Sequence, residues 1–194
     1  MNMLQLNRYR QVLKDKLTPE RYHHSLCVRN RAARLAACHQ VDWYRAALAG
    51  LLHDICHCEP KEAQLKYLKA HGILLDNVLE TNPPLWHAMC GSVYLREALQ
   101  IRDRQVLAAV RYHTTGRAGM SPVEQVVCLA DATSSDREYP GARELGELAD
   151  RSLDEAMFAY LRHTVAEQVG KGQPVVRDAW EAYNYYSTAK DDIL

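Results

Sequence analysis

Apolar side chains recur every three or four residues along most of this chain of 194 residues, which is the period of an amphipathic helix. Alternating strand patterns and Asn-Gly or Asp-Gly hairpin signals are absent. The stretch ALAGLLHDIC, residues 47–56, interrupts the pattern: six residues without a polar side chain lead directly into His53 and Asp54. The sequence therefore predicts an all-α fold. It also places an imidazole and a carboxylate, His53 and Asp54, at the end of an apolar helix, where polar side chains require an explanation.

Capping signals place the helix starts. Thr18 precedes Pro19, and Ser121 and Glu124 form a capping box around Pro122. With the apolar period, these signals predict helices over residues 19–40, 42 to 53–56, 59 or 60 to 72, 82–99, 103–113, from 121 onward, 143–149, 152–169 and 175–188. The stretches 114–121 and 133–142 are predicted to be irregular. No linker rich in Pro, Gly or Ser divides the chain, so residues 1–194 are predicted to form a single all-α domain.

The balance of charged residues restricts which classes of partner the protein is expected to bind. Lys and Arg total 24, and Asp and Glu total 24, which argues against general nucleic-acid binding and polybasic membrane binding but leaves room for a local basic patch. The first residues, MNMLQLNRYRQVLKDK, are too charged for a signal peptide, and no apolar run reaches the ~18 residues of a membrane span. We expect a soluble, cytoplasmic protein with no nucleic-acid or membrane partner.

Six cysteines without a secretory signal are expected to be thiols. Cys56 and Cys58 flank His57 beside the His-Asp pair, which suggests zinc. A structural zinc site, however, requires cysteines two to four residues apart and a second pair of ligands. We therefore interpret both cysteines as half-buried thiols without a ligand role.

Ionisable side chains fall on apolar helix faces, or at their ends, on five predicted helices. His24 shares a face with Val28, whereas His23 lies on a more polar face. Gly50 lies on the face of Asp54, where a small residue lets a neighbouring helix approach closely. The complete set of inward ionisable residues is His24, His53, Asp54, His87, His113 and Asp131.

A single inward histidine is usually a core residue with one hydrogen bond, and a single inward aspartate is usually a cap or half of an ion pair. Six such groups together would cost several kcal/mol of desolvation if they were buried without a cation. Imidazole and carboxylate are ligands of divalent metals, and four histidines with two carboxylates suit iron, manganese, cobalt, nickel or zinc better than calcium or magnesium. The sequence therefore predicts a metal site built at helix ends.

Six ordered segments carry a family resemblance: HSLCV (24–28), AGLLHDI (49–55), LWHAMCGS (85–92), HTTGRAGMS (113–121), LADATSSDR (129–137) and AYN (182–184). They resemble the HD superfamily of metal-dependent phosphohydrolases, and within it the symmetrical diadenosine tetraphosphate hydrolases. The resemblance covers nearly the whole chain. It implies a single-domain HD-type helical bundle over residues 1–194, and hydrolysis of diadenosine tetraphosphate to two ADP by a water activated at two metals.

The same resemblance assigns roles to individual residues. It implies two divalent transition metals, often iron: the first held by His24, His53, Asp54 and Asp131, the second by His87 and His113, with Asp54 bridging. The implied catalytic residues are Asp54, His87, His113 and Arg137.

The substrate contacts are predicted less directly. Arg137 resembles the arginine that follows the Ala-Asp motif in the family, and Thr114 and Arg117 lie beside His113. His57 stands where the family commonly carries lysine, so a phosphate contact there would titrate near pH 6.5 unless perturbed. A second departure is Ser134-Ser135, where the family tends to show Glu-Pro.

Two other functions remain open at this point. One is an HD-type phosphatase of mononucleotides or other phosphate esters. The other is a non-catalytic nucleotide-binding module with a structural metal, whose docking surface would be the aromatic end with Trp180, Tyr183, Tyr185 and Tyr186. We favour a last helix packed on the bundle for this end, and a homodimer contact there stays open.

Overall fold

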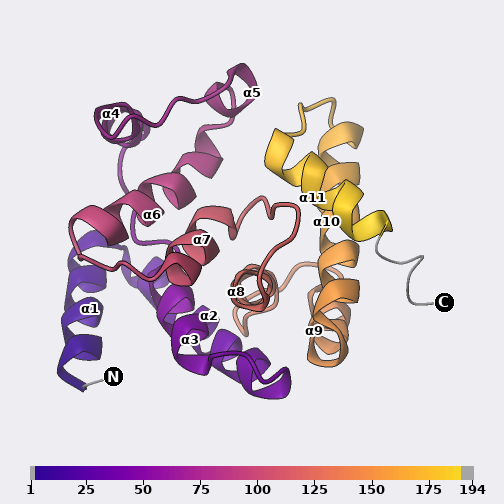
Figure 1. The fold of residues 1–194 in the computed structure, drawn as a ribbon, viewed down its shortest axis with the longest axis horizontal. Helices are drawn as coiled ribbons and strands as arrows, with labels where there is room; N and C mark the ends of the chain where they lie inside the picture. The colour runs from indigo at the N-terminus through magenta and orange to yellow at the C-terminus, as the bar shows by residue number, and fades with distance from the viewer. Residues whose placement is uncertain (1–2, 189–194) are drawn as a thin grey trace.

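The computed structural model describes residues 3–188, with side chains from residue 7 onward, and contains no strand within that part of the chain (Figure 1). Its helices are α1 (Met3–Lys16), α2 (Pro19–Cys38), α3 (Trp43–Leu52), α4 (Lys61–Ala70), α5 (Asn77–Glu80), the 3₁₀ helix η1 (Pro83–Leu85), α6 (Trp86–Glu97), α7 (Arg104–Tyr112), α8 (Pro122–Ala132), α9 (Ala142–Arg151), α10 (Leu153–Gly170) and α11 (Arg177–Thr188). The predicted all-α fold class is confirmed.

The caps confirm the predicted helix starts. The Thr18 side chain accepts a hydrogen bond from the backbone N–H of Arg21 at 3.3 Å. The Ser121 hydroxyl accepts from the N–H of Glu124, whose carboxylate accepts from the N–H of Ser121 at 2.8 Å, so the capping box is complete. These bonds satisfy amide groups that the first turn of a helix leaves unpaired.

Two predictions of helix extent are corrected. Helices α1 and α5 were not predicted, because neither presents a long apolar period. The helix predicted over 82–99 begins instead as the 3₁₀ helix η1 and becomes α-helical only at Trp86. Pro83 and Pro84 lack amide hydrogens, which favours this tight turn at the entry of α6.

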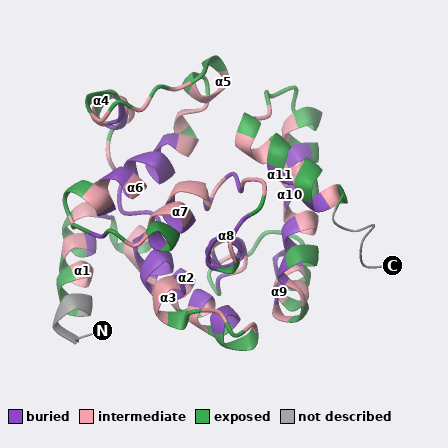
Figure 2. Ribbon diagram, in the orientation of Figure 1, coloured by how far each residue is buried: buried purple, intermediate pink, exposed green. Residues whose placement is uncertain are grey.

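Helix α8 lies between the two sides of the molecule. It packs against α2 and α7 on one side and against α9 and α10 on the other, as Figure 1 shows. The buried residues follow these contacts, and α6 and α8 are buried over much of their length (Figure 2). The C-terminal end of α8 is therefore enclosed by several helices.

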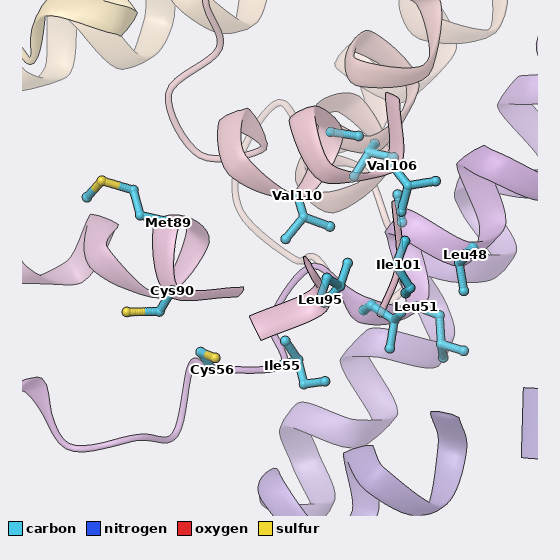
Figure 3. Packing of buried hydrophobic residues seen from close by; sticks show 14 of the residues in the cluster. Leu48, Leu51, Ile55, Cys56, Met89, Cys90, Leu95, Ile101, Val106 and Val110 are labelled. Carbon is cyan, nitrogen blue, oxygen red and sulfur yellow. The ribbon is translucent and has the colours of Figure 1, made fainter. Parts of the chain in front are cut away.

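Two hydrophobic clusters support this arrangement. The first joins α3, α6 and α7 through residues such as Leu51, Leu95 and Val110 (Figure 3). The second joins α2, α8 and α10 through residues such as Leu35 and Leu129. The six predicted metal ligands lie on, or directly after, helices of both clusters.

The C-terminal helix α11 packs on the bundle as predicted. Ala182 and Tyr186 are buried, and the Tyr186 hydroxyl accepts a hydrogen bond from the side-chain amide of Gln125 at 2.9 Å. Trp180 and Tyr185 remain about half exposed. None of the described helices has both the length and the apolar character that crossing a membrane requires.

Gly50 allows the close approach of α2 and α3 that its small size predicted. A Cβ atom at Gly50 would lie 3.1 Å from the Cβ of Ala32 and 3.3 Å from the carbonyl oxygen of Val28. Because overpacking a tight contact forces backbone shifts, we expect Gly50→Val to lower the free energy of unfolding by about 1–3 kcal/mol. Chemical denaturation of the metal-free protein, followed by circular dichroism, measures this.

The matched control is Gly170→Val at the end of α10, where a Cβ atom would meet nothing within 4 Å. We expect this change to stay within about 0.5 kcal/mol of the wild type. Equal stability of the two variants would contradict the tight contact between α2 and α3.

Candidate metal centre

The structure brings the six predicted ligands to one place. His24 lies in α2, His53 and Asp54 directly follow α3, and His87 is the second residue of α6. His113 directly follows α7, and Asp131 lies in the last turn of α8. All four histidines and Asp54 are buried, with exposed fractions of 5% or less, and only Asp131 is partly exposed. Helix ends position most of the set because a side chain there can point past the backbone into the enclosed centre.

The Nδ1 atoms of the four histidines all point away from the centre. Those of His53, His87 and His113 lie 2.7–2.8 Å from the carbonyl oxygens of the residues three positions earlier, Gly50, Pro84 and Val110. A carbonyl oxygen can only accept, so each Nδ1 carries the hydrogen. In the neutral rings Nε2 then has a lone pair, which is the arrangement of a metal-binding histidine.

The two oxygens of Asp54 face different pairs of histidines. Oδ1 lies 3.1 Å from Nε2 of His87 and 3.7 Å from Nε2 of His113. Oδ2 lies 3.4 Å from Nε2 of His53 and 4.0 Å from Nε2 of His24. Asp131 Oδ1 adds to the second pair, at 3.0 Å from His24 Nε2. One carboxylate thus stands between two groups of ligand atoms.

This donor set fits divalent metal ions. Nε2 of His53 is buried and has no hydrogen-bond partner among the described residues. Nε2 of His87 and Nε2 of His113 lie 3.2 Å apart, so in the neutral rings two lone pairs face each other. Ligand atoms lie within 4.8 Å of one another in two groups, His24 with His53 and Asp131, and His53 with Asp54 and His113. A cation would satisfy each of these lone pairs.

The electrostatics of the two carboxyl groups support the same conclusion. Burial alone would raise the pKa of Asp54, but the imidazoles of His53, His113 and His87 hold it well below the usual range. Burial is likewise outweighed at Asp131, where His24, His53 and Arg137 lower the pKa. Both groups are therefore carboxylates at neutral pH, the form that binds metal.

Two arginines add positive charge at the centre. Arg137 donates from Nε to the backbone oxygen of Asp131 at 2.9 Å and from Nη2 to the carboxylate of the same residue. Arg21 donates to Asp54 Oδ2 at 2.9 Å. Sequence reasoning missed Arg21, although it lies three residues before His24 and hence on a neighbouring face of the same helix.

Sequence reasoning also missed Asp136, whose Oδ2 lies 2.7 Å from Nδ1 of His24. Ser134 stands where the family tends to carry glutamate; its side chain is buried and donates a hydrogen bond to Asp136 at 2.6 Å. This chain thus lacks the acidic side chain at residue 134 but has a carboxylate two residues later, at Asp136. Asp136 lies in the irregular stretch 133–142, where no sequence pattern distinguishes it from a solvent-exposed residue.

Of the other predicted substrate contacts, Arg117 has a different partner. Its Nε and Nη2 donate to the two oxygens of the buried Glu124 at 2.6 and 2.8 Å, and its Nη1 donates to a backbone oxygen at 3.0 Å. These hydrogen bonds give Arg117 an internal role, and its substrate contact stays a prediction. The Thr114 hydroxyl, in contrast, is buried and makes no hydrogen bond to any described residue.

His57 lies with its ring centroid 4.9 Å from that of His87. Burial lowers the pKa of His57 to about 4, so the ring is neutral from about pH 5 upward. The condition of an unperturbed pKa is therefore not met, and the substrate contact of His57 stays a prediction. We expect the pH profiles of turnover for the wild type and for His57→Gln to have the same shape between pH 6 and 8. Steady-state rates across this range measure it, and a decline with pH in the wild type alone would contradict it.

Cys56 and Cys58 do not join the centre. Cys56 is buried and its pKa is raised to about 12 by desolvation, so it stays a thiol at neutral pH, and Cys58 is exposed. Neither belongs to a metal-ligating group within the described residues. Both thiols were predicted to be half-buried, but Cys56 is buried and Cys58 is exposed.

Two cavities lie beside residues of the centre or their neighbours in the chain. The larger has a volume of about 540 Å³ and is lined by Asp131, Arg137 and residues of α9 and α10. The smaller has a volume of about 260 Å³ and is lined by Pro84, Thr114 and residues of α10 and α11. Thr164 of α10 lines both cavities. The larger cavity thus reaches the centre at Asp131, whereas the smaller is lined by neighbours of His87 and His113 and by none of the six predicted ligands.

The helical fold and the histidine–aspartate centre define a protein of a divalent-metal-binding class. A model of the HD domain matches residues 21–136, which contain all six predicted ligands. The chain belongs to the HD domain family, as the order of its motifs predicted.

Three curated relatives share one name. A symmetrical bis(5′-nucleosyl)-tetraphosphatase of Bacillus subtilis is 35% identical over 173 residues, covering 89% of this chain and 92% of the relative. A protein of the same name from Staphylococcus aureus is 28% identical over 192 residues, covering 98% of each chain. These relatives match almost end to end, including the helices beyond the HD domain.

A solved structure has the same fold. It is a crystal structure of a predicted HD superfamily hydrolase involved in NAD metabolism from Clostridium acetobutylicum. It is 32% identical, superimposes with a TM-score of 0.92, and covers 95% of this chain and 97% of its own. The fold of the HD superfamily therefore extends over nearly the whole chain.

Proposed function

We propose that this protein hydrolyses diadenosine tetraphosphate symmetrically, to two ADP, with two divalent transition metals held at the centre. The observation that carries the proposal is the position of Asp54, whose two oxygens face two different pairs of histidine Nε2 atoms. The choice of substrate is supported by the name of the relatives that match this chain almost end to end.

The geometry supports a division of the ligands. His24, His53, Asp131 and Oδ2 of Asp54 would hold the first metal, and His87, His113 and Oδ1 of Asp54 the second. The donor set suits iron among the borderline ions, with manganese, cobalt, nickel and zinc as alternatives. Two such metals supply a water activated near neutral pH and neutralise charge on the phosphoryl oxygens.

The residues of this chain would position the polyphosphate. Arg137 and Arg21 each donate to a ligand carboxylate and have exposed fractions of 34% and 30%, which leaves part of each guanidinium free for phosphate. The Thr114 hydroxyl has an unused donor beside His113. These cations and donors stabilise the negative charge that shifts onto the leaving phosphate.

The space around the centre suits a substrate with two nucleosides. A water adds to a phosphorus atom next to the central bridging oxygen, the bond from this phosphorus to that oxygen breaks, and each product retains two phosphates. The cavities of about 540 and 260 Å³, which share Thr164, would each take one nucleoside. A phosphatase of mononucleotides would need only one of them.

The test couples metal content to product identity. The protein is purified anaerobically without a metal-affinity tag, and its transition metals are counted per chain by mass spectrometry. The same sample then receives diadenosine tetraphosphate, and the nucleotides are resolved by chromatography. We expect about two metals per chain and ADP as the sole product.

Three results would contradict the proposal in different ways. AMP with ATP would show asymmetrical cleavage. Metal without turnover of this substrate, but with release of phosphate from mononucleotides, would support the phosphatase alternative. No metal and no turnover, even after anaerobic loading with iron or manganese, would support a binding module. A sample treated with chelator serves as the control for metal dependence.

A further inference from the structure

His24 differs from the other three histidines in the partner of its Nδ1 atom. His53, His87 and His113 each lie at or beside a helix end, where the carbonyl three residues earlier can accept from the ring. His24 lies inside α2, where the carbonyls are used by the helix itself. Its Nδ1 lies instead 2.7 Å from a carboxylate oxygen of Asp136, which is 112 residues further along the chain.

Asp136 is itself held in place. Its other oxygen, Oδ1, accepts a hydrogen bond of 2.6 Å from the hydroxyl of Ser134. The side chain of Ser134 is buried, that of His24 is 4% exposed, and that of Asp136 is 25% exposed. The three groups form a continuous chain of hydrogen bonds that ends at Nε2 of His24, 3.0 Å from Asp131.

We infer that Asp136 is a positioning residue for the first metal: it fixes the Nε2 lone pair of His24 toward the centre, and Ser134 fixes Asp136. A carboxylate accepts only, so the hydrogen of the neutral ring must be on Nδ1. An ionised acceptor also makes the ring a stronger donor of electrons than a backbone carbonyl does. This inference rests on the metal assignment of the proposed function and does not depend on the substrate.

The hydrogen bond between Asp136 and His24 also helps to hold Arg137 at the centre. Arg137 follows Asp136 directly, and its backbone N–H donates to the carbonyl oxygen of Ser134 at 2.9 Å. A loop that is fixed on α2 through Asp136 therefore presents Arg137 to Asp131. Ser134, where this chain departs from the pattern of its family, thus supports both a ligand and a substrate contact.

The experiment is a metal titration of the purified, metal-stripped full chain with Mn²⁺, by competition with a chromophoric chelator. We expect Asp136→Ala to weaken the first site by about 10- to 100-fold and to leave the second site unchanged. Asp136→Asn retains an acceptor for Nδ1 and loses only the charge, so the Mn²⁺ affinity of its first site should lie between those of the wild type and Asp136→Ala. Ser134→Ala should have a smaller effect than Asp136→Ala.

The matched control is Asp150→Asn, because Asp150 is similarly exposed at 28% and accepts from Arg31 and Arg34 away from the centre. Circular dichroism of the metal-free variants checks that each is folded. If Asp136→Ala does not fold, the inference is tested on Asp136→Asn, which preserves the shape of the side chain. Wild-type affinity at both sites in the Asp136 variants would overturn the inference, as would absence of Mn²⁺ binding by the wild type. Metal binding without hydrolysis of diadenosine tetraphosphate would overturn only the proposed function.

Discussion

Replacing Asp54 by alanine is expected to remove both metals and to reduce turnover by at least about a thousandfold. One carboxylate faces both histidine pairs, so its loss takes a ligand from each site. It also removes a buried negative charge that would offset the two proposed dications. Without the metals, the water that attacks phosphorus is no longer activated near neutral pH. Mass spectrometry for metal content and chromatography for ADP release measure the two effects on one sample.

The control is Asp15→Ala, which removes an exposed carboxylate whose partner is Gln11 on the same helix. It should retain the wild-type metal content and rate. If Asp54→Ala kept both metals, or full activity, the bridging position of this carboxylate would be wrong.

Replacing His113 by alanine is expected to separate the two sites. His24, His53, Asp131 and Oδ2 of Asp54 remain, so one metal per chain should stay bound. Turnover should fall by about a hundredfold or more, because the second metal no longer neutralises phosphoryl charge in the displacement. Metal counting and steady-state kinetics on the same preparation distinguish the two outcomes.

His23→Ala is the matched control for His113→Ala, because His23 is an exposed histidine on α2 beside the ligand His24. Loss of both metals from His113→Ala would show that the sites are not separable. Wild-type turnover with one metal would show that the second metal is not needed.

The helices that the sequence predicts best are those whose ends are defined locally. Thr18 with Pro19, and Ser121 with Glu124, encode their caps within four residues, and the structure confirms both. Helix α1 was missed because its first turn has no acidic residue and its apolar residues are mixed with charged and polar ones. Periodicity detects a helix when one face is strongly apolar and loses it when the face is mixed.

The ligands were predictable for a related reason: a histidine or aspartate on an apolar face contradicts its surroundings. Arg21 and Asp136 carry no such signal, because a charged residue in a mixed helix or in a loop looks solvent-exposed in the sequence. Arg117 was assigned to substrate because it follows His113 closely, yet its guanidinium turns to Glu124. Only the tertiary arrangement determines the partner of a long, flexible side chain.

The origin of the ligands in both hydrophobic clusters has a consequence for cooperativity. His24 of α2 and Asp131 of α8 meet His53 and Asp54 after α3 at one point, so the proposed first metal would cross-link the two cores, whereas the second would join α3, α6 and α7 within one of them. Binding to the native state alone stabilises it by RT ln(1 + [metal]/Kd). The loaded protein should then exchange its core amide hydrogens as one unit, whereas the stripped protein can open α6 and α7 separately from α8 and α10. Metal supply would thus govern the lifetime of the protein as well as its chemistry.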